Sequence, residues 1–100
     1  MTRAAQQTAT RPQLIFFYSG RDGRARRVEG YLAQVLQRRQ NHETFVVRRV
    51  DIDTRPDLAE RFRINGDPAL LVVSEKAVRG RLDAPKGCTE IKALLAPWLR

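Results

Sequence analysis

Few side chains in this sequence are suited to covalent or metal chemistry. It contains one cysteine, Cys88, and one histidine, His42. A lone cysteine excludes an intrachain disulfide. A helix start favours a thiolate, but we interpret Cys88 in Gly87-Cys88-Thr89-Glu90 as a small residue that opens a helix. His42 has no second metal ligand near it in the sequence, so we expect no metal site and no cofactor.

Arginine is the other residue type that bears on chemistry. The net charge is +8, and 16 arginines against 3 lysines supply the positive charge. Guanidinium groups bind carboxylates and phosphates bidentately. Four of them crowd one predicted helix start: Arg21, Arg24, Arg26 and Arg27. The charge attracts acidic proteins or nucleic acid, whereas arginine-rich coding explains the composition without any partner, and both explanations stay open.

Strands and helices alternate along the predicted framework. Continuous apolar or β-branched runs predict strands over residues 14–18, 44–52, 69–73 and 77–82. Apolar residues at helical spacing predict helices over residues 25–36, 54–62 and 89–98. Thr54 and Pro56 are typical of a helix start, and Ser74-Glu75-Lys76 between the last two strands predicts a hairpin turn. The order β-α-β-α-β-β-α predicts a mixed four-stranded sheet with helices on both faces, the first two strands parallel and the last two antiparallel.

The length and composition predict one domain. A chain of 100 residues with 42% hydrophobic residues suffices for a single core. The basic, hydroxyl-rich residues 1–11 predict a flexible N-terminal tail, which leaves residues 12–100 as the domain. No apolar run approaches the roughly 18–20 residues that cross a bilayer, so we expect no membrane association. Because a single cysteine fits a reducing compartment, we expect a cytoplasmic location.

Three motifs in this order resemble the thioredoxin superfamily. Residues 17–26, FYSGRDGRAR, resemble the family's aromatic strand end, loop and CxxC motif. Residues 50–56, VDIDTRP, resemble the segment after its next strand, and residues 62–70, FRINGDPAL, resemble the segment around its cis-proline. The resemblance extends from Pro12 to Leu99. It implies a three-layer α/β/α thioredoxin-like fold without room for the family's full N-terminal strand and helix.

The same resemblance places Asp22 and Ala25 at the two cysteines of the CxxC motif. Dithiol exchange needs one thiolate to attack and a second thiol to resolve the mixed disulfide, and a carboxylate and a methyl group do neither. Phe16 stands where thioredoxin has its buried acid. We therefore expect no dithiol–disulfide oxidoreductase activity, and hence no enzyme, with Asp22 capping the helix where the thiolate stood.

The resemblance also implies a groove between the Asp22 loop and the Pro68 loop. In it the Pro68 peptide bond is cis, and Asp67 lies near Asp22 as an ionised carboxylate balanced by arginines. We expect the groove to bind a segment of an unidentified protein partner, and an acidic one fits the arginines. The predicted groove residues are Ser19, Gly20, Arg21, Asp22, Gly23, Arg24, Asp67, Pro68 and Ala69, with Arg26 and Arg27 as an adjoining basic patch.

Two other functions compete with this interaction module. One is a binder of nucleic acid or another polyanion through the arginine-rich surface, although no recognition motif or row of exposed aromatic residues accompanies the charge. The other is a redox protein that uses Cys88 alone.

Overall fold

The part of the chain that the structure describes, residues 11–37 and 44–99 of a computed structural model, has the predicted order of elements. Along the chain these are β1 (Gln13–Tyr18), α2 (Arg24–Leu36), β2 (Val46–Asp51), α3 (Pro56–Arg61), β3 (Ala69–Ser74), β4 (Ala77–Asp83) and α4 (Cys88–Leu95). Residues 1–10 of the expected N-terminal tail, and the loop that contains His42, lie outside the described residues.

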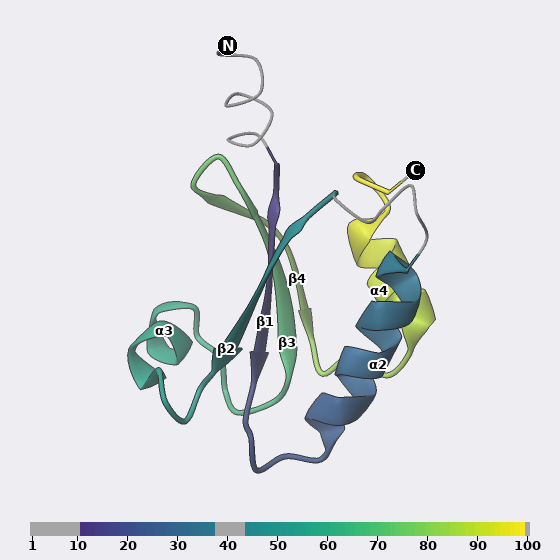
Figure 1. Cartoon of the computed structure of the whole chain (residues 1–100). Coiled ribbons are helices and arrows are strands. Elements are labelled where there is room, and N and C mark those ends of the chain that lie inside the picture. The colour runs from purple at the N-terminus through teal and green to yellow at the C-terminus, as the bar shows by residue number, and fades with distance from the viewer. Residues whose placement is uncertain (1–10, 38–43, 100) are drawn as a thin grey trace.

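The four strands form one mixed sheet in the order β2-β1-β3-β4. β1 and β2 are parallel, with Phe16 opposite Arg49, whereas β3 runs antiparallel to β1 and to β4. The thioredoxin-like α/β fold that the sequence predicted is therefore confirmed. The helices lie on both sides of the sheet, α2 and α4 on one side and α3 on the other (Figure 1).

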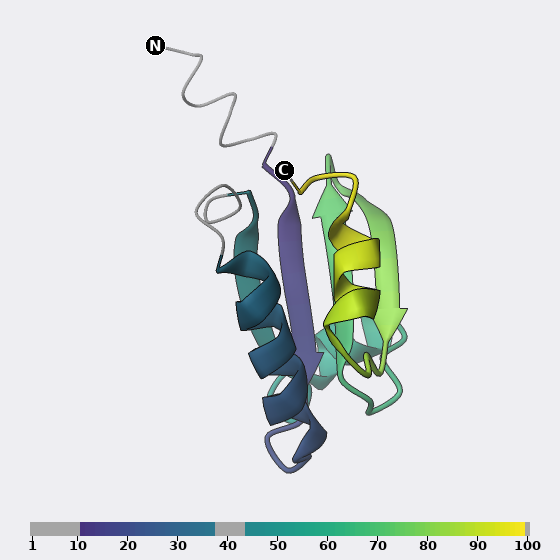
Figure 2. The ribbon, with the colours of Figure 1, turned by 90° about the vertical axis from the view of Figure 1, so that its right-hand side faces the viewer.

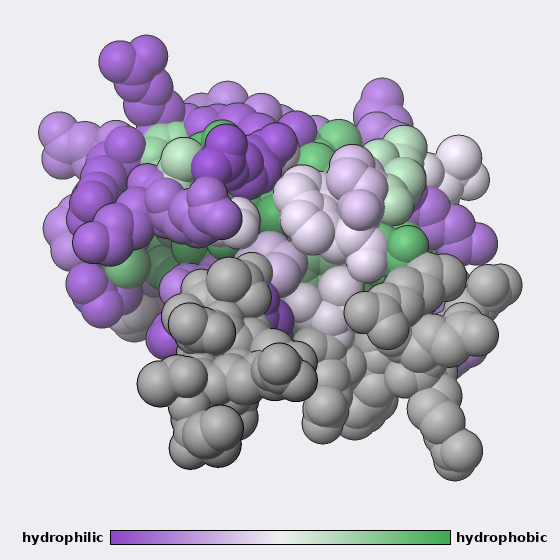
Figure 3. Space-filling view, turned by 90° about the horizontal axis from the view of Figure 1, so that it is seen from above, coloured by the Kyte–Doolittle hydropathy of each residue, from purple (hydrophilic) through white to green (hydrophobic). Residues whose placement is uncertain are grey.

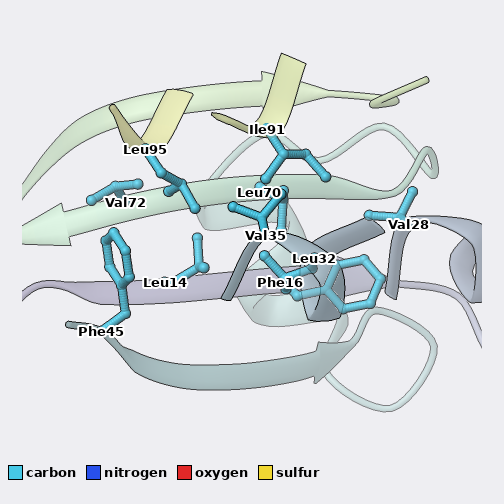
Figure 4. Close-up of a cluster of buried hydrophobic side chains, with 10 residues drawn as sticks. All are labelled: Leu14, Phe16, Val28, Leu32, Val35, Phe45, Leu70, Val72, Ile91 and Leu95. Atoms are coloured by element: carbon cyan, nitrogen blue, oxygen red, sulfur yellow. The ribbon is translucent and has the colours of Figure 1, made fainter. Parts of the chain in front are cut away.

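The larger core fills the space between the sheet and the helices α2 and α4, which lie side by side across it (Figure 2). Phe16 of β1 is 1% exposed, and Ile91 and Leu95 of α4 are fully buried against the sheet. The ten buried residues of this cluster come from two strands, β1 and β3, from the helices α2 and α4, and from the segment before β2, as Figure 4 shows. Burying apolar side chains is the main favourable term in folding, so this face positions α2 and the loop before it.

A smaller core lies on the opposite face, under α3. Ile15, Phe17, Ala69 and Leu71 are its buried members. Phe62 follows α3 and packs its ring 5.5 Å from that of Phe17. Arg81 of β4 donates hydrogen bonds to the carbonyls of Phe62 at 2.6 Å and Arg63 at 2.8 Å. These bonds satisfy two carbonyls just beyond the end of α3, and they tie this segment to the edge strand β4.

The start of α3 and the end of α4 differ from the predictions, because a side chain at each end contacts another part of the chain. Thr54 does not cap α3: its hydroxyl donates to the Asp51 carbonyl at 3.1 Å, and Arg55 is the residue before the helix. The last helix ends at Leu95, and Trp98 beyond it packs its ring edge-on against Phe45, with 6.1 Å between the centroids.

The surface is mostly polar at the end of the sheet where β3 turns into β4. Seen from that end, hydrophilic residues cover most of the described surface, with apolar residues visible between them (Figure 3). Among residues 11–37 and 44–99, no helix has the length and apolar character needed to cross a membrane.

Candidate functional site

The loop between β1 and α2 is closed by a carboxylate at the helix start. α2 begins at Arg24, and Gly23 precedes it without a side chain that could cap the helix. Asp22 therefore acts from one residue further out: its Oδ1 accepts the backbone N–H of Arg24 at 2.9 Å. The first N–H groups of a helix have no partner within the helix, and Asp22 satisfies one of them. The Asp22 carboxylate thus stabilises this helix start, but the N-cap residue is Gly23 and not Asp22, where the sequence analysis predicted the cap.

Arg24 joins the Asp22 loop to the Pro68 loop. Its Nε lies 2.9 Å from Asp22 Oδ2, and its Nη2 lies 2.6 Å from the same oxygen and 2.8 Å from Asp67 Oδ1. The side-chain hydrogen bonds from Arg24 lower the pKa of Asp22, and those to Asp22 and Asp67 raise the pKa of Arg24. The expected meeting of Asp22 and Asp67 thus takes the form of a three-membered ion bridge, with Arg24 between the two carboxylates.

The other side of the same loop is held against the end of β2. Ser19 donates its hydroxyl to Asp53 Oδ2 at 2.7 Å and accepts the Arg21 N–H at 3.3 Å. A Cβ on Gly20 would lie 3.3 Å from Asp51 Oδ2, closer than most side chains tolerate. Gly20 therefore lets the loop approach the carboxyl end of β2.

The Asp67–Pro68 peptide bond is trans, so the cis geometry that the sequence resemblance implied is wrong for this chain. Trans is the favoured form of an X–Pro bond by about 0.5–1 kcal/mol, and the neighbouring backbone groups are used internally. Pro68 accepts the Ala84 N–H at 2.7 Å, and the Asp67 N–H points to Asn65 Oδ1 at 3.4 Å.

Two hollows flank the ion bridge. The first, which we call the Pro68 cavity, measures about 220 Å³ and lies between α2, the Pro68 loop and the segment after β4. Its lining residues are Arg24, Arg27, Val28, Tyr31, Pro68, Ala84, Pro85 and Lys86. The second, the Ser19 cavity, measures about 370 Å³ and is more open. It is lined by Tyr18, Ser19, Gly20, Arg21, Asp22, Gly23, Ala25, Arg26 and Glu29.

The predicted groove residues therefore divide between two places. Arg24 and Pro68 line the Pro68 cavity, and Asp67 reaches it through its ion pair with Arg24. The residues from Ser19 to Gly23 line the Ser19 cavity instead. Ala69 lines neither, because it is fully buried in the smaller core. The basic patch also divides, since Arg26 lines the Ser19 cavity and Arg27 the Pro68 cavity.

Five residues line the Pro68 cavity without having been predicted from the sequence: Val28, Tyr31, Ala84, Pro85 and Lys86. One signal could have found the last three. In an antiparallel β3–β4 pair the residues that follow β4 lie beside those that precede β3, and Ala69 indeed pairs with Asp83. The segment after Asp83 therefore had to lie next to Pro68. Ala84 has a positive φ of 48°, a conformation that costs a non-glycine residue energy, and the hydrogen bond to Pro68 helps to hold it there.

Cys88 is the first residue of α4 and faces α2. Its Sγ lies 2.9 Å from Gln34 Oε1 and 3.8 Å from the Tyr31 carbonyl. These contacts fit the interpretation of Cys88 as a small residue packed at a helix start. Within residues 11–37 and 44–99, no group of three or more His, Cys, Asp or Glu side chains is arranged to hold a metal ion.

Comparison with known proteins agrees with this fold. Residues 3–97 match the Thioredoxin family profile. The chain therefore belongs to the thioredoxin family, yet with a single cysteine in its sequence it has no CxxC motif. No curated protein matches the sequence closely.

Solved thioredoxins have the same fold at low sequence identity. Reduced desulfothioredoxin from Desulfovibrio vulgaris Hildenborough is 20% identical in sequence, with a TM-score of 0.74. The alignment covers 86% of this chain and 80% of the desulfothioredoxin chain. Oxidised mitochondrial thioredoxin 3 from Saccharomyces cerevisiae is 16% identical at 0.71, with 94% and 88% covered. The germline-specific thioredoxin Deadhead from Drosophila melanogaster is 14% identical at 0.77, with 97% and 90% covered.

Proposed function

We propose that this thioredoxin-family chain is a non-catalytic interaction module, and that it binds a segment of another protein at the Pro68 cavity. The observation that carries the proposal is the ion bridge of Arg24 with Asp22 and Asp67 beside that cavity. A side chain that cannot exchange disulfides occupies the helix start, while a hollow of about 220 Å³ beside it has room for a partner's side chain. Concave, largely apolar sites of this kind are where binding is expected first.

The loss of catalysis follows from the chemistry of the residues at the helix start. Disulfide exchange proceeds by attack of a thiolate on a disulfide sulfur, and neither Asp22 nor Ala25 supplies sulfur. Cys88 would have to leave Gln34 and Tyr31 to take part. We therefore expect that insulin disulfide reduction with dithiothreitol proceeds no faster with the protein than without it, and turnover above that baseline would contradict the proposal.

The site of binding is tested by photo-crosslinking. A benzoylphenylalanine at Tyr31, which lines the Pro68 cavity, is expected to capture a discrete protein from a lysate of the source cells. The matched position is Val78 on β4, which is 49% exposed and lies outside that cavity. Equal capture from both positions, or capture from Val78 alone, would place the interaction elsewhere.

The arrangement of the arginines gives the polyanion alternative less support. β2 and β4 are opposite edges of the sheet, so Arg48 and Arg81 lie at opposite edges. Arg81 and Arg55 are paired with Asp83 and Asp57, which reduces their attraction for phosphates. Nucleic-acid binding needs a contiguous basic patch or stripe, and two arginines at opposite edges of the sheet do not form one.

A further inference from the structure

The Pro68 cavity combines positive charge with an apolar floor. Among its lining residues are the cations Arg24, Arg27 and Lys86, and none of the lining residues is acidic. The three cations come from two segments far apart in the sequence, the first turn of α2 and the segment before α4. Holding like charges around one hollow costs electrostatic energy. A ligand that carries a negative charge would lower that cost.

The three cations differ in how far they are already neutralised. Arg24 is balanced by Asp22 and Asp67. Arg27 and Lys86, by contrast, have no carboxylate within 4.0 Å among residues 11–37 and 44–99. The backbone of Lys86 is held in place, because its N–H donates to Glu90 Oε1 at 2.7 Å. Two uncompensated cations therefore face the hollow from walls of defined position.

The floor of the cavity is apolar, and a backbone hydrogen bond joins its two proline segments. Pro68 and Pro85 are buried, and Tyr31 is half-buried on α2. The hydrogen bond from Ala84 to Pro68 ties the two proline segments together, so this wall is preformed. A preformed pocket loses less entropy on binding than one that must be ordered.

We propose, as a refinement that rests on the proposed function, that the Pro68 cavity selects a peptide segment in which an aspartate or glutamate adjoins an apolar residue. The apolar side chain packs on Tyr31 and the prolines, and the carboxylate binds Arg27 and Lys86. Charge complementarity argues for this occupant, since the cavity presents cations and no acid. A second copy of this chain fits less well, because its net charge is also +8.

A random dodecapeptide phage library, panned on the full chain, provides the probe. The enriched peptides are expected to contain an acidic residue beside an apolar one. The best of them, labelled with fluorescein, is titrated by anisotropy against the wild type and against Arg27→Gln and Lys86→Gln. Each variant is expected to weaken binding roughly 3- to 10-fold, the loss of one charge-assisted contact in a partly hydrated site. The matched controls Arg48→Gln and Lys92→Gln remove the same charges outside the cavity and are expected to leave the affinity unchanged.

Each result decides between the refinement and the function on which it rests. Peptides that depend on Tyr31, tested with Tyr31→Ala, but not on Arg27 or Lys86 overturn the acidic preference and leave the interaction module standing. Enrichment of no peptide that depends on Tyr31 overturns both. Equal loss in Arg48→Gln, or displacement by poly(U) with a steep salt dependence, indicates general polyanion attraction and also overturns the refinement. Thermal melts of all the variants show whether any loss of binding reflects unfolding instead.

Discussion

At the scale of single residues, Arg24 differs from the other arginines of the basic helix start because its charge is already paired within the chain. From the sequence it was one of four arginines available to a partner, but in the structure its guanidinium is shared between Asp22 and Asp67. Its charge links two loops of the same chain. Arg27, three positions on and one turn along the helix, keeps its charge for the Pro68 cavity. Neighbouring arginines of the same type thus differ: Arg24 has a structural role, and Arg27 has the binding role that we propose.

The pH dependence of stability tests the role of Asp22. Because Arg24 lowers its pKa in the folded state, ionised Asp22 stabilises the fold above its unfolded pKa of about 4, and this contribution is lost as the pH falls through the folded value. We expect Asp22→Asn to lower Tm at neutral pH, and the difference from the wild type to shrink toward zero at about pH 2.

Glu60→Gln is the matched control for that experiment, because it removes the same charge from an exposed residue of α3. It is expected to change Tm little at either pH. A deficit of Asp22→Asn that stays constant from neutral to acidic pH would mean that the charge of Asp22 does not stabilise the fold.

At the scale of elements, the β3–β4 hairpin contains a turn that the sequence fills with unsuitable residues. Glu75 and Lys76 form its two-residue loop with φ values of 53° and 66°. Such loops favour Asn-Gly, because glycine adopts positive φ without steric cost. The register of the hairpin decides which residues meet at the far end of β3 and β4, where Pro68 and Ala84 bond.

Lys76→Gly is expected to stabilise the protein by up to about 1 kcal/mol, because relief of the left-handed conformation outweighs the added freedom of the unfolded chain. For a domain of this size that corresponds to a Tm rise of at most roughly 4–8 °C. The same replacement at Lys92, inside α4, is expected to lower the stability by about 1 kcal/mol. Calorimetric melts compare the two variants, and a loss at both positions would show that the turn is not strained.

At the scale of the whole molecule, the two faces of the sheet contribute unequally to stability. The face under α2 and α4 has ten buried residues in its cluster, and the face under α3 has four. The Pro68 cavity lies beside α2, on the face with the larger core. A binding site next to the better packed core keeps its geometry, since close-packed interiors deform little.

A matched pair of leucine truncations tests this asymmetry. Leu95 of α4 is fully buried, and Leu58 of α3 is half-buried. Leu95→Ala is expected to cost about 2–5 kcal/mol of unfolding free energy, and Leu58→Ala less than about half as much. Urea denaturation at equilibrium measures both losses of unfolding free energy. Because alanine is tolerated equally well in the two helices, the difference between the losses reports the difference in burial. Equal losses would show that the thin face under α3 carries as much stability as the face under α2 and α4.

The sequence alone determined the order of elements, the strand directions and the absence of a CxxC motif. The burial of an element can be predicted from the pattern of apolar residues within that element. A continuous apolar run such as Leu14–Tyr18 indicates a buried strand, and the helical spacing of Val28, Leu32 and Val35 indicates a helix with one buried face. The ends of α3 and α4 differed from the predicted ends, at Thr54 and Trp98. A hydroxyl or an aromatic ring can contact several partners, and the sequence does not show which one it contacts.

Tertiary structure alone decided how the candidate site is assembled. The division of the predicted groove into two cavities, the trans bond before Pro68, and the pairing of Arg24 with Asp67 all depend on loops that meet across the fold. The tertiary structure also decided that Arg27 and Lys86 line the same cavity. Ion pairs and cavities form between segments distant in sequence, and their geometry depends on side-chain directions that no local pattern records.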